Sequence, residues 1–339
     1  MNNKFKTGVL LINLGTPDKP HPDDVKIYLK EFLNDPRVID IPSVPRHILV
    51  NYIIIPKRYK NTTELYQKIW TEDGSPLLYY TKRSAALLQD DLGEDFVVKF
   101  AMRYRNPSVK SVLDEFNSIN ISRLIIIPLF PQYASATVGS IHEEVFNIIK
   151  NWQVIPELKI ISQFHADKNY IESCAKVASQ FNLREYDHIL FSYHGLPERQ
   201  IKKADNTGVC LTKNCCDTIS ERNLYCYRAQ CVNTSRLIAS QLEIEEEKYT
   251  VCFQSRLGKE PWIKPYADET IIELAQKGYK KLLVFSPSFV ADCLETIYEI
   301  GIEYDQLFKE NGGESVTLVP GLNDSAHWIY TLKEMVLKK

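Results

Sequence analysis

A histidine and a row of carboxylates stand where side chains could carry out acid–base or metal chemistry. His194 follows the apolar run HILFSY and precedes Gly195. This pattern predicts an imidazole at the carboxyl end of a buried strand, beside a turn in which the backbone takes unusual angles. Such an imidazole could accept a proton or bind a metal, or it could simply cap the strand through hydrogen bonds.

Four carboxylates lie in the segment SPSFVADCLETIYEIGIEYDQLF, which begins at Ser286 and which we expect to be helical. Glu295, Glu299 and Glu303 are four residues apart, and Asp292 precedes them by one turn. On a stripe facing a cleft, such like charges favour protonation or cation binding. An ordinary solvated helix face has the same pattern. The apolar and small residues at the start of the segment favour burial of Glu295.

A second group of reactive side chains is the cysteine-rich segment 210–231. It contains five of the eight cysteines, Cys210, Cys215, Cys216, Cys226 and Cys231. Five thiols this close predict a zinc ion or an iron–sulfur cluster, which four cysteines usually hold. Reduced thiols in a loop are the alternative. We expect the other three, Cys174, Cys252 and Cys293, to be core or pocket thiols.

The elements that must position these residues alternate between short apolar runs and longer periodic segments. This alternation is typical of parallel strands joined by crossover helices, so we predict an α/β protein. The predicted strands are 8–13, 97–102, 124–129, 159–162, 188–193, 249–253, 281–286 and 315–319.

An approximate internal repeat indicates how these strands are organised. LLINLGTP recurs in pattern as LFSYHGLP, VVKFAMRYRNP as TVCFQSRLGKEP, and a strand, a Pro-bearing turn and a helix start in 123–145 recur in 281–300. Duplication explains three ordered pairs better than chance. We predict two similar doubly wound, Rossmann-like domains with parallel four-stranded sheets, 1–166 and 167–339. Ligands of such sheets bind beyond the carboxyl ends of the strands, so we expect the site in a cleft between the domains.

Composition and missing motifs exclude several classes of protein. The 339 residues include 41 Lys+Arg and 43 Asp+Glu, and this net charge of -2 gives no reason to expect a nucleic-acid partner. The apolar run near the amino terminus is too short for a signal peptide or membrane span, so we expect a cytoplasmic protein. Nucleotide-binding glycine motifs, a serine-hydrolase elbow and a His-Glu-x-x-His pair are absent from the sequence.

A set of ordered motifs gives a more specific indication. They are LINLGTP, DGSPL, MRYRNP, PLFPQYASATVGS, SYHGLPER, FQSRLGKEPWIKPYADET and ADCLETIYEIGIEY. Together they resemble the ferrochelatases along almost the whole chain. The resemblance implies a chelatase-like fold and an enzyme that inserts ferrous iron, as substrate, into protoporphyrin IX. The products would be haem and two protons, in the terminal step of haem biosynthesis.

The resemblance also implies roles for the acidic and imidazole side chains. His194 and Glu295 match the family's catalytic and metal-site pair on opposite sides of the macrocycle, with His194 accepting pyrrole protons or binding the incoming metal. Asp292, Glu299 and Glu303 match an acidic row that serves as a metal or proton path. A bent macrocycle exposes a nitrogen lone pair, and binding it better than the flat ring would lower the barrier to insertion.

Matching motifs supply candidate porphyrin contacts, for which plain core packing or structural hydrogen bonding is the alternative. These candidates are Leu14, Tyr133, Leu196 and Trp262 for the ring walls and Ser75, Arg103 and Tyr104 near the propionates. The segment 44–61 resembles the family's lip over the pocket, which can touch the membrane, so we expect peripheral contact with the inner face of the membrane; a buried helix with a basic end is the alternative.

Some ferrochelatases carry a two-iron, two-sulfur (2Fe-2S) cluster near the carboxyl terminus, where this chain has no cysteine beyond Cys293. A cluster here would use the internal segment, with Cys210, Cys226, Cys231 and either Cys215 or Cys216 as ligands. Two other functions fit less of the sequence: another tetrapyrrole chelatase, and a haem or metal carrier without turnover. The opening LINLGTP resembles the protoporphyrin rather than the coproporphyrin branch. The sequence makes no prediction of the oligomeric state.

Overall fold

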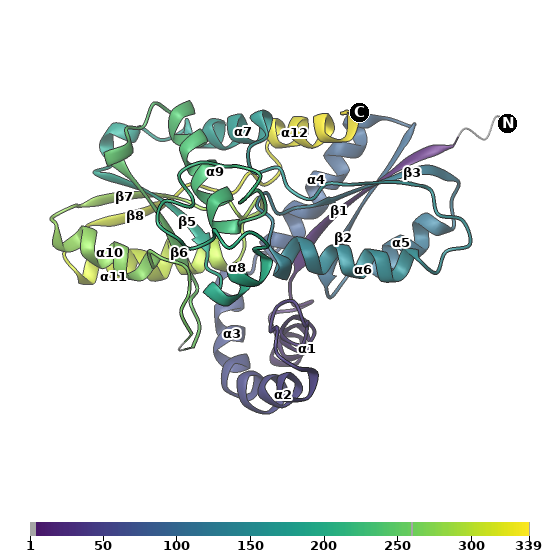
Figure 1. The fold of residues 1–339 in the computed structure, drawn as a ribbon, viewed down its shortest axis with the longest axis horizontal. Helices are drawn as coiled ribbons and strands as arrows, with labels where there is room; N and C mark the ends of the chain where they lie inside the picture. The colour runs from purple at the N-terminus through teal and green to yellow at the C-terminus, as the bar shows by residue number, and fades with distance from the viewer. Residues whose placement is uncertain (1–4, 259, 339) are drawn as a thin grey trace. The chain divides into compact units, whose positions relative to one another are not determined.

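The computed structural model describes residues 5–258 and 260–338, which form two compact α/β units (Figure 1). Each unit contains one sheet of four parallel strands with helices packed against it. This confirms the predicted α/β class and the two parallel four-stranded sheets.

The sheet of the first unit has the order β2-β1-β3-β4. Its strands are β1 (Lys6–Gly15), β2 (Phe96–Tyr104), β3 (Ile121–Pro128) and β4 (Glu157–Ile160). Alternate residues of central β1, Leu10 and Ile12, are fully buried against α5 (Val109–Asn117) and α6 (Ser140–Ile149). Because β1 is covered on both sides, its residues read as a continuous apolar run, as in buried parallel strands generally.

The sheet of the second unit has the equivalent order, β6-β5-β7-β8. Its strands are β5 (His188–His194), β6 (Tyr249–Gln254), β7 (Lys281–Phe285) and β8 (Ser315–Leu318). Leu190 and Val284 are buried in a core that includes α10 (Ala267–Gln276) and α11 (Asp305–Glu310). In both units the first strand in sequence is central, with the second strand on one side and the third on the other, so the repeat seen in the sequence is also a repeat of topology.

The remaining helices connect the strands. They are α1 (Pro22–Leu33), α2 (Ser43–Ile48), η1 (Leu49–Ile54), α3 (Ile55–Ile69), α4 (Pro76–Leu92), η2 (Ser135–Gly139), α7 (Lys168–Ala178), η3 (Leu183–Glu185), α8 (Glu198–Ala204), α9 (Tyr227–Gln241), η4 (Glu246–Lys248), η5 (Leu294–Tyr304) and α12 (Ala326–Leu337). Within the described part of the chain, no helix is long and apolar enough to cross a membrane.

The division by contacts differs in detail from two continuous domains, 1–166 and 167–339. Residues 131–134 group with the second unit, and those from 329 onward group with the first. The reasons are local hydrogen bonds. The backbone N–H of Tyr133 donates to Gln230 Oε1 (2.6 Å), and Lys159 Nζ donates to the carbonyl of Met335 near the end of α12 (2.9 Å).

The acidic segment begins its helix later than the sequence predicts. The expectation of a helix from Ser286 was wrong: η5 starts at Leu294, and Asp292 precedes it. The extended backbone of Cys293 (φ -151°, ψ -170°) caps the helix. From Leu294 to Tyr304 the helix is of the π type, with hydrogen bonds five residues apart. This geometry is rare in proteins overall, and where it occurs it often lies at a functional site.

Candidate functional site

His194 is the last residue of β5, whose six preceding residues are all buried. The imidazole Nδ1 lies 2.7 Å from the carbonyl oxygen of Gly195. A carbonyl only accepts hydrogen bonds, so Nδ1 must carry the hydrogen, and the neutral ring then presents the lone pair of Nε2. The strand end therefore holds the imidazole in the tautomer in which Nε2 accepts a proton or binds a metal.

The turn after His194 is fixed from several directions. The backbone N–H of Gly195 donates to the carbonyl of Gln254 (2.8 Å), and the hydroxyl of Tyr227 donates to the carbonyl of His194 (2.9 Å). A Cβ on Gly195 would lie 2.9 Å from the Gln254 oxygen and 3.1 Å from the Trp262 ring. This position therefore suits glycine because the neighbouring backbone and ring approach it closely.

Glu295 lies in the first turn of η5 and is partly buried. Its backbone carbonyl accepts a hydrogen bond from Gln254 Nε2 (3.0 Å). Burial and then the charge of Glu295 raise the pKa of the Cys293 thiol well above its usual range. Gln254 is the direct partner of His194 in the β5–β6 register, so His194 and Glu295 both adjoin the same residue.

Glu299 accepts four hydrogen bonds, more than a solvated helix face would give it. Gln254 Nε2 (3.0 Å) and Ser255 Oγ (2.6 Å) donate to Oε2, and Ser255 N (3.0 Å) and the Tyr304 hydroxyl (3.0 Å) donate to Oε1. Its neighbour Glu303 is exposed overall, but partial desolvation and then the charge of Glu299 raise the pKa of its carboxyl group.

Asp292 is buried and saturated with donors. Its Oδ1 accepts from Thr296 Oγ1 and from the backbone N–H of Gly321, both at 3.0 Å, and its Oδ2 accepts from Asn323 Nδ2 at 2.8 Å. These contacts tie the start of η5 to the segment after β8. They favour a structural role for Asp292, whereas Glu295 and Glu303 are the more accessible carboxylates of the row.

The candidate propionate contacts of the first unit form a buried polar network around Asp35. Arg103 Nη2 and the Tyr104 hydroxyl each donate to Asp35 Oδ2 at 2.8 Å, and Ser140 Oγ donates to the same oxygen at 2.5 Å. Ser75 is buried and accepts from Thr16 Oγ1 (2.9 Å). Asp35 drew no attention in the sequence, because a lone aspartate after a helix carries no local signal.

The other candidate pocket walls lie on loops and strand ends of their units. Leu14 is half-buried near the end of β1. In the second unit the Leu196 carbonyl accepts from Ile263 N (3.0 Å), and Trp262 Nε1 donates to the Leu257 carbonyl (3.0 Å), so these two loops support one another. The Tyr133 ring packs edge-on against another tyrosine ring, 5.5 Å between centroids.

Four of the five clustered cysteines, all but Cys231, lie close to another cysteine of the segment. The thiols of Cys210 and Cys216 are each within hydrogen-bonding reach of Cys226, and Cys215 Sγ lies 3.5 Å from Cys216 Sγ. Cys231 is fully buried on α9. Burial raises the pKa of Cys210 to about 11. Over residues 5–258 and 260–338, no three His, Cys, Asp or Glu side chains already form a metal-binding group.

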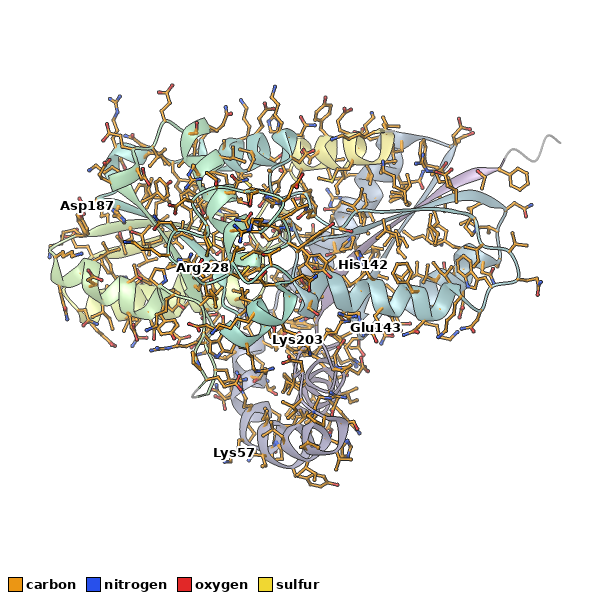
Figure 2. All side chains as sticks on the ribbon, viewed as in Figure 1. Lys57, His142, Glu143, Asp187, Lys203 and Arg228 are labelled. Atoms are coloured by element: carbon orange, nitrogen blue, oxygen red, sulfur yellow. The ribbon has the colours of Figure 1, made fainter. Side chains whose placement is uncertain are left out.

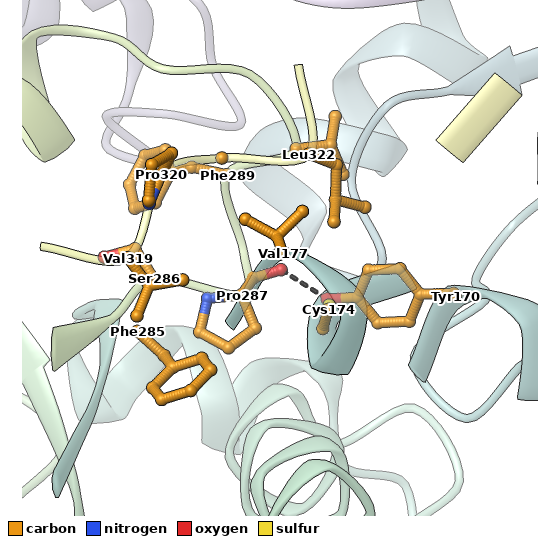
Figure 3. Close-up of a pocket in the computed structure, with 12 residues that line it drawn as sticks. Tyr170, Cys174, Val177, Phe285, Ser286, Pro287, Phe289, Val319, Pro320 and Leu322 are labelled. Atoms are coloured by element: carbon orange, nitrogen blue, oxygen red, sulfur yellow. Dashed lines mark hydrogen bonds between the residues drawn. The ribbon is translucent and has the colours of Figure 1, made fainter. Parts of the chain in front are cut away.

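A hollow between β7, α7 and the segment after β8 is distinct from these residues (Figure 3). Its empty volume is about 320 Å³, including open solvent, and its lining includes Tyr170, Cys174 and Gly321. The Tyr170 hydroxyl donates to the Pro287 carbonyl (2.5 Å) at its edge. A hollow at the lower end of the size range of small-ligand pockets does not suit a macrocycle.

Comparisons with known proteins identify what the chain resembles. The sequence model of the family described as Ferrochelatase matches residues 6–339. The chain is 45% identical over 332 residues to the ferrochelatase of Legionella pneumophila (strain Lens), covering 98% of this chain and 99% of that protein. It is also 45% identical over 341 residues to the ferrochelatase of Coxiella burnetii (strain Dugway 5J108-111), covering 100% and 95%.

Among solved structures, SirB from Bacillus subtilis with Fe3+ superimposes with a TM-score of 0.52. The match covers 98% of this chain and 96% of SirB, at 11% sequence identity. It supports the chelatase-like fold that the sequence motifs predicted.

Proposed function

Since this chain belongs to the ferrochelatase family, we propose that His194 and Glu295 carry out its reaction, the insertion of ferrous iron into a porphyrin in haem biosynthesis. The protein is thus a metal chelatase, a lyase that acts on porphyrin and ferrous iron. The observation that supports this assignment best is the bond between His194 Nδ1 and the Gly195 carbonyl, because it leaves Nε2 as the reactive nitrogen.

In the proposed reaction a free porphyrin loses two N–H protons and gains one Fe2+, which sheds its water. Nε2 of neutral His194 accepts the two pyrrole protons one after the other and releases each to solvent, and the Glu295 carboxylate, on the other side of the ring, offers oxygen ligands to the hydrated cation. A pocket that binds the bent ring more tightly than the flat one stabilises the transition state. The tautomer of His194 serves either as proton acceptor or as first metal ligand, because both roles use the lone pair of Nε2.

The acidic row provides a route behind Glu295. Glu303 is exposed, and desolvation and the charge of Glu299 raise its pKa, so it keeps its proton to a higher pH than an ordinary glutamate. Glu299 lies between Glu303 and Glu295 in the sequence of η5 and electrostatically couples to Glu303. We assign Asp292, also a candidate for this path, mainly to holding the start of the helix through its three donors.

The candidate ring contacts lie on loops and strand ends. We propose that Leu14, Tyr133, Leu196 and Trp262 contact the faces and edges of the porphyrin ring, since each is an apolar or aromatic side chain that is not fully buried. Ser75 and the Asp35-linked residues Arg103 and Tyr104 would act near the propionates. Because Tyr104 is almost fully buried, its contribution is through the position of Arg103 rather than through its own hydroxyl.

We further propose that the cysteine-rich segment holds a 2Fe-2S cluster through Cys210, Cys226 and Cys231, with the fourth ligand from Cys215 or Cys216. The donor chemistry fits, since four-cysteine ligation is usual and the thiols of Cys210 and Cys216 each interact with Cys226. Hydrogen bonds fix the backbone of two of the cysteines. Asp205 accepts from Cys210 N (2.7 Å), and Asn223 Nδ2 donates to the Cys215 carbonyl (2.7 Å).

Anaerobic reconstitution with iron and sulfide, followed by metal and sulfide analysis and visible absorbance, tests this cluster. Cys226→Ser should lose the chromophore, and Cys174→Ala, a buried cysteine outside the loop, should keep it. Comparing Cys215→Ser with Cys216→Ser identifies the fourth ligand. If the purified protein instead holds one zinc ion per chain, the segment is a structural zinc site and not a cluster site. If it binds no metal, both assignments are wrong.

The segment 44–61 is proposed as a peripheral membrane contact of a cytoplasmic protein. Val44, Ile48, Tyr52 and Ile53 on α2 and η1 expose 68%, 51%, 71% and 44% of their surface. Lys57, labelled in Figure 2, follows on exposed α3 with Arg58 and Lys60. Exposed apolar side chains beside basic ones suit an interface with anionic lipid.

Co-sedimentation with vesicles that contain anionic lipid tests this contact. The double variant Ile48→Asp/Tyr52→Asp should lose binding, whereas Ile119→Asp, at another exposed apolar site, should retain it. Equal binding of all three proteins would contradict the assignment.

Anaerobic incubation with ferrous iron and protoporphyrin IX, followed by metalloporphyrin absorbance, tests the catalytic proposal. His194→Ala should abolish insertion without abolishing porphyrin binding. Insertion unchanged by the substitution would reject the role of His194. Faster insertion into coproporphyrin III than into protoporphyrin IX by the unmodified protein would change the assigned ring and leave the catalytic pair intact.

A further inference from the structure

We propose that Gln254 is a positioning residue that sets the separation between the imidazole of His194 and the carboxylates of η5. The inference rests on the proposed function of His194 and Glu295. It identifies a side chain that touches neither the metal nor the macrocycle and acts through its neighbours. Gln254 is the last residue of β6 and is 1% exposed.

One side of Gln254 holds the end of β5. Its backbone carbonyl accepts from Gly195 N (2.8 Å), and its side-chain Oε1 accepts from Ser192 Oγ (2.7 Å). These two bonds flank His194, which is also the direct partner of Gln254 in the parallel register. A shift of Gln254 would therefore move the turn that orients the imidazole.

The other side of Gln254 holds η5. Its Nε2 donates to the backbone carbonyl of Glu295 and to Oε2 of Glu299, both at 3.0 Å. The amide orientation is fixed, because the nitrogen is the donor and both partners on this side accept. Both N–H bonds of the amide and its oxygen are thus used, in a buried setting where an unmade hydrogen bond is costly.

Ser255 extends the same connection. It has a positive φ of 63°, which is uncommon for a residue with a side chain, and this conformation lets its N–H and hydroxyl both reach Glu299. The Tyr304 hydroxyl completes the set. Glu299 is therefore anchored to the end of β6 through Gln254 and Ser255, and Gln254 is the residue of this pair that also bonds to β5.

The alternative is that Gln254 merely fills a buried polar position and contributes to stability alone. Two features argue against it. Its side chain bonds to Ser192, which lies two residues before His194, and to Glu295 and Glu299 of η5. A nonpolar side chain of similar size would fill the same space without any of these bonds. A misplacement of about 1 Å in such a site costs on the order of 100-fold in rate.

Gln254→Glu tests the inference because it keeps the shape, removes both donors and adds a charge against Glu299. We expect kcat for iron insertion to fall ~100-fold, the acid limb of its pH–rate profile to move toward higher pH, and the porphyrin Kd from fluorescence quenching to change less than about 3-fold. Ser255→Ala, which removes one donor to Glu299, should lower kcat and shift the acid limb in the same directions, by smaller amounts. Gln254→Asn retains the amide one methylene short and serves if the glutamate variant does not fold.

Leu274→Ala in the core of the same unit is the matched control for lost stability. It should lower the melting temperature without moving the pH–rate profile. Normal kcat and pH profile in Gln254→Glu, or a loss equal to that of Leu274→Ala with no profile shift, would overturn the positioning role. If His194→Ala and Glu295→Gln also retain insertion, the catalytic assignment itself fails; if they abolish it while Gln254→Glu is normal, the inference about Gln254 alone fails.

Discussion

Replacement of Gly195 by alanine is the smallest change that should disturb the proposed site. The added Cβ would lie 2.9 Å from the Gln254 oxygen and 3.1 Å from the Trp262 ring, whereas ordinary contact begins at 3.4 Å. The Gln254 carbonyl must therefore retreat by about 0.5 Å, which weakens its bond to the Gly195 N–H. Gly195 does not have a positive φ, so the effect comes from crowding.

The expected magnitudes follow from this displacement. Overpacking of this kind costs about 1–3 kcal/mol of the free energy of unfolding. If a 1 Å misplacement costs about 100-fold in rate, half that displacement should lower the insertion rate about 10-fold. The carbonyl of Gly195 also holds Nδ1 of His194, so the loss should appear in kcat more than in porphyrin affinity.

Anaerobic insertion kinetics, porphyrin fluorescence quenching and urea unfolding measure the three quantities for Gly195→Ala. Gly301→Ala in η5 is the matched control, because its nearest neighbour, the Thr296 carbonyl, is 3.8 Å away. It should keep full activity and lose no stability. A Gly195→Ala protein that is destabilised but inserts iron at the original rate would refute the argument that this turn positions the imidazole.

Three other substitutions test separate parts of the molecule. Asp35→Asn should cost about 3–5 kcal/mol in urea unfolding, because Arg103 loses its buried anion, and an unchanged unfolding free energy would contradict that. Glu303→Gln should stabilise the protein at pH 7, where the raised pKa makes ionised Glu303 unfavourable, and this gain should vanish as the pH falls toward 4.5; a constant gain would exclude the cause. Burial lowers the pKa of His165 to about 4, so neutral His165 contributes up to about 3 kcal/mol to the free energy of unfolding. This contribution is complete above pH 6.5 and is lost as the pH falls toward 4. His165→Gln should flatten this pH dependence of the unfolding free energy, and an unchanged slope would contradict the assignment.

The strands were predictable because a strand buried on both faces consists of consecutive apolar residues, and such runs can be seen in the sequence. A central parallel strand such as β1 must be apolar at consecutive positions, and all eight predicted strands are present in the described residues with ends shifted by a few positions. The start of η5 was not predictable in the same way. Residues 286–293 are apolar and small enough for a helix, but the extended backbone at Cys293 and the donors to Asp292 hold them in a loop.

The site was only partly predictable because residue type and tertiary contact carry different information. Residue type and spacing made His194 and Glu295 candidates, and the resemblance to the ferrochelatases selected them over a strand-capping histidine and a solvated helix face. Gln254 and Ser255 have unremarkable types, and their importance arises only where β6 meets η5. Asp35 is likewise distinguished by the donors that converge on it, which come from residues far away in sequence. Such polar connections have no period that a sequence could display.

The internal repeat places different side chains at the equivalent ends of the two central strands. In each unit a glycine at the end of the central strand is crowded by the backbone of the neighbouring strand: Gly15, the last residue of β1, by Tyr104, and Gly195, which directly follows β5, by the carbonyl of Gln254 at the end of β6. The residue before the glycine is Leu14 in the first unit and His194 in the second. Because equivalent strand ends carry an apolar side chain in one unit and an imidazole in the other, a duplicated fold could acquire chemistry by changing the side chain at a strand end that both units share.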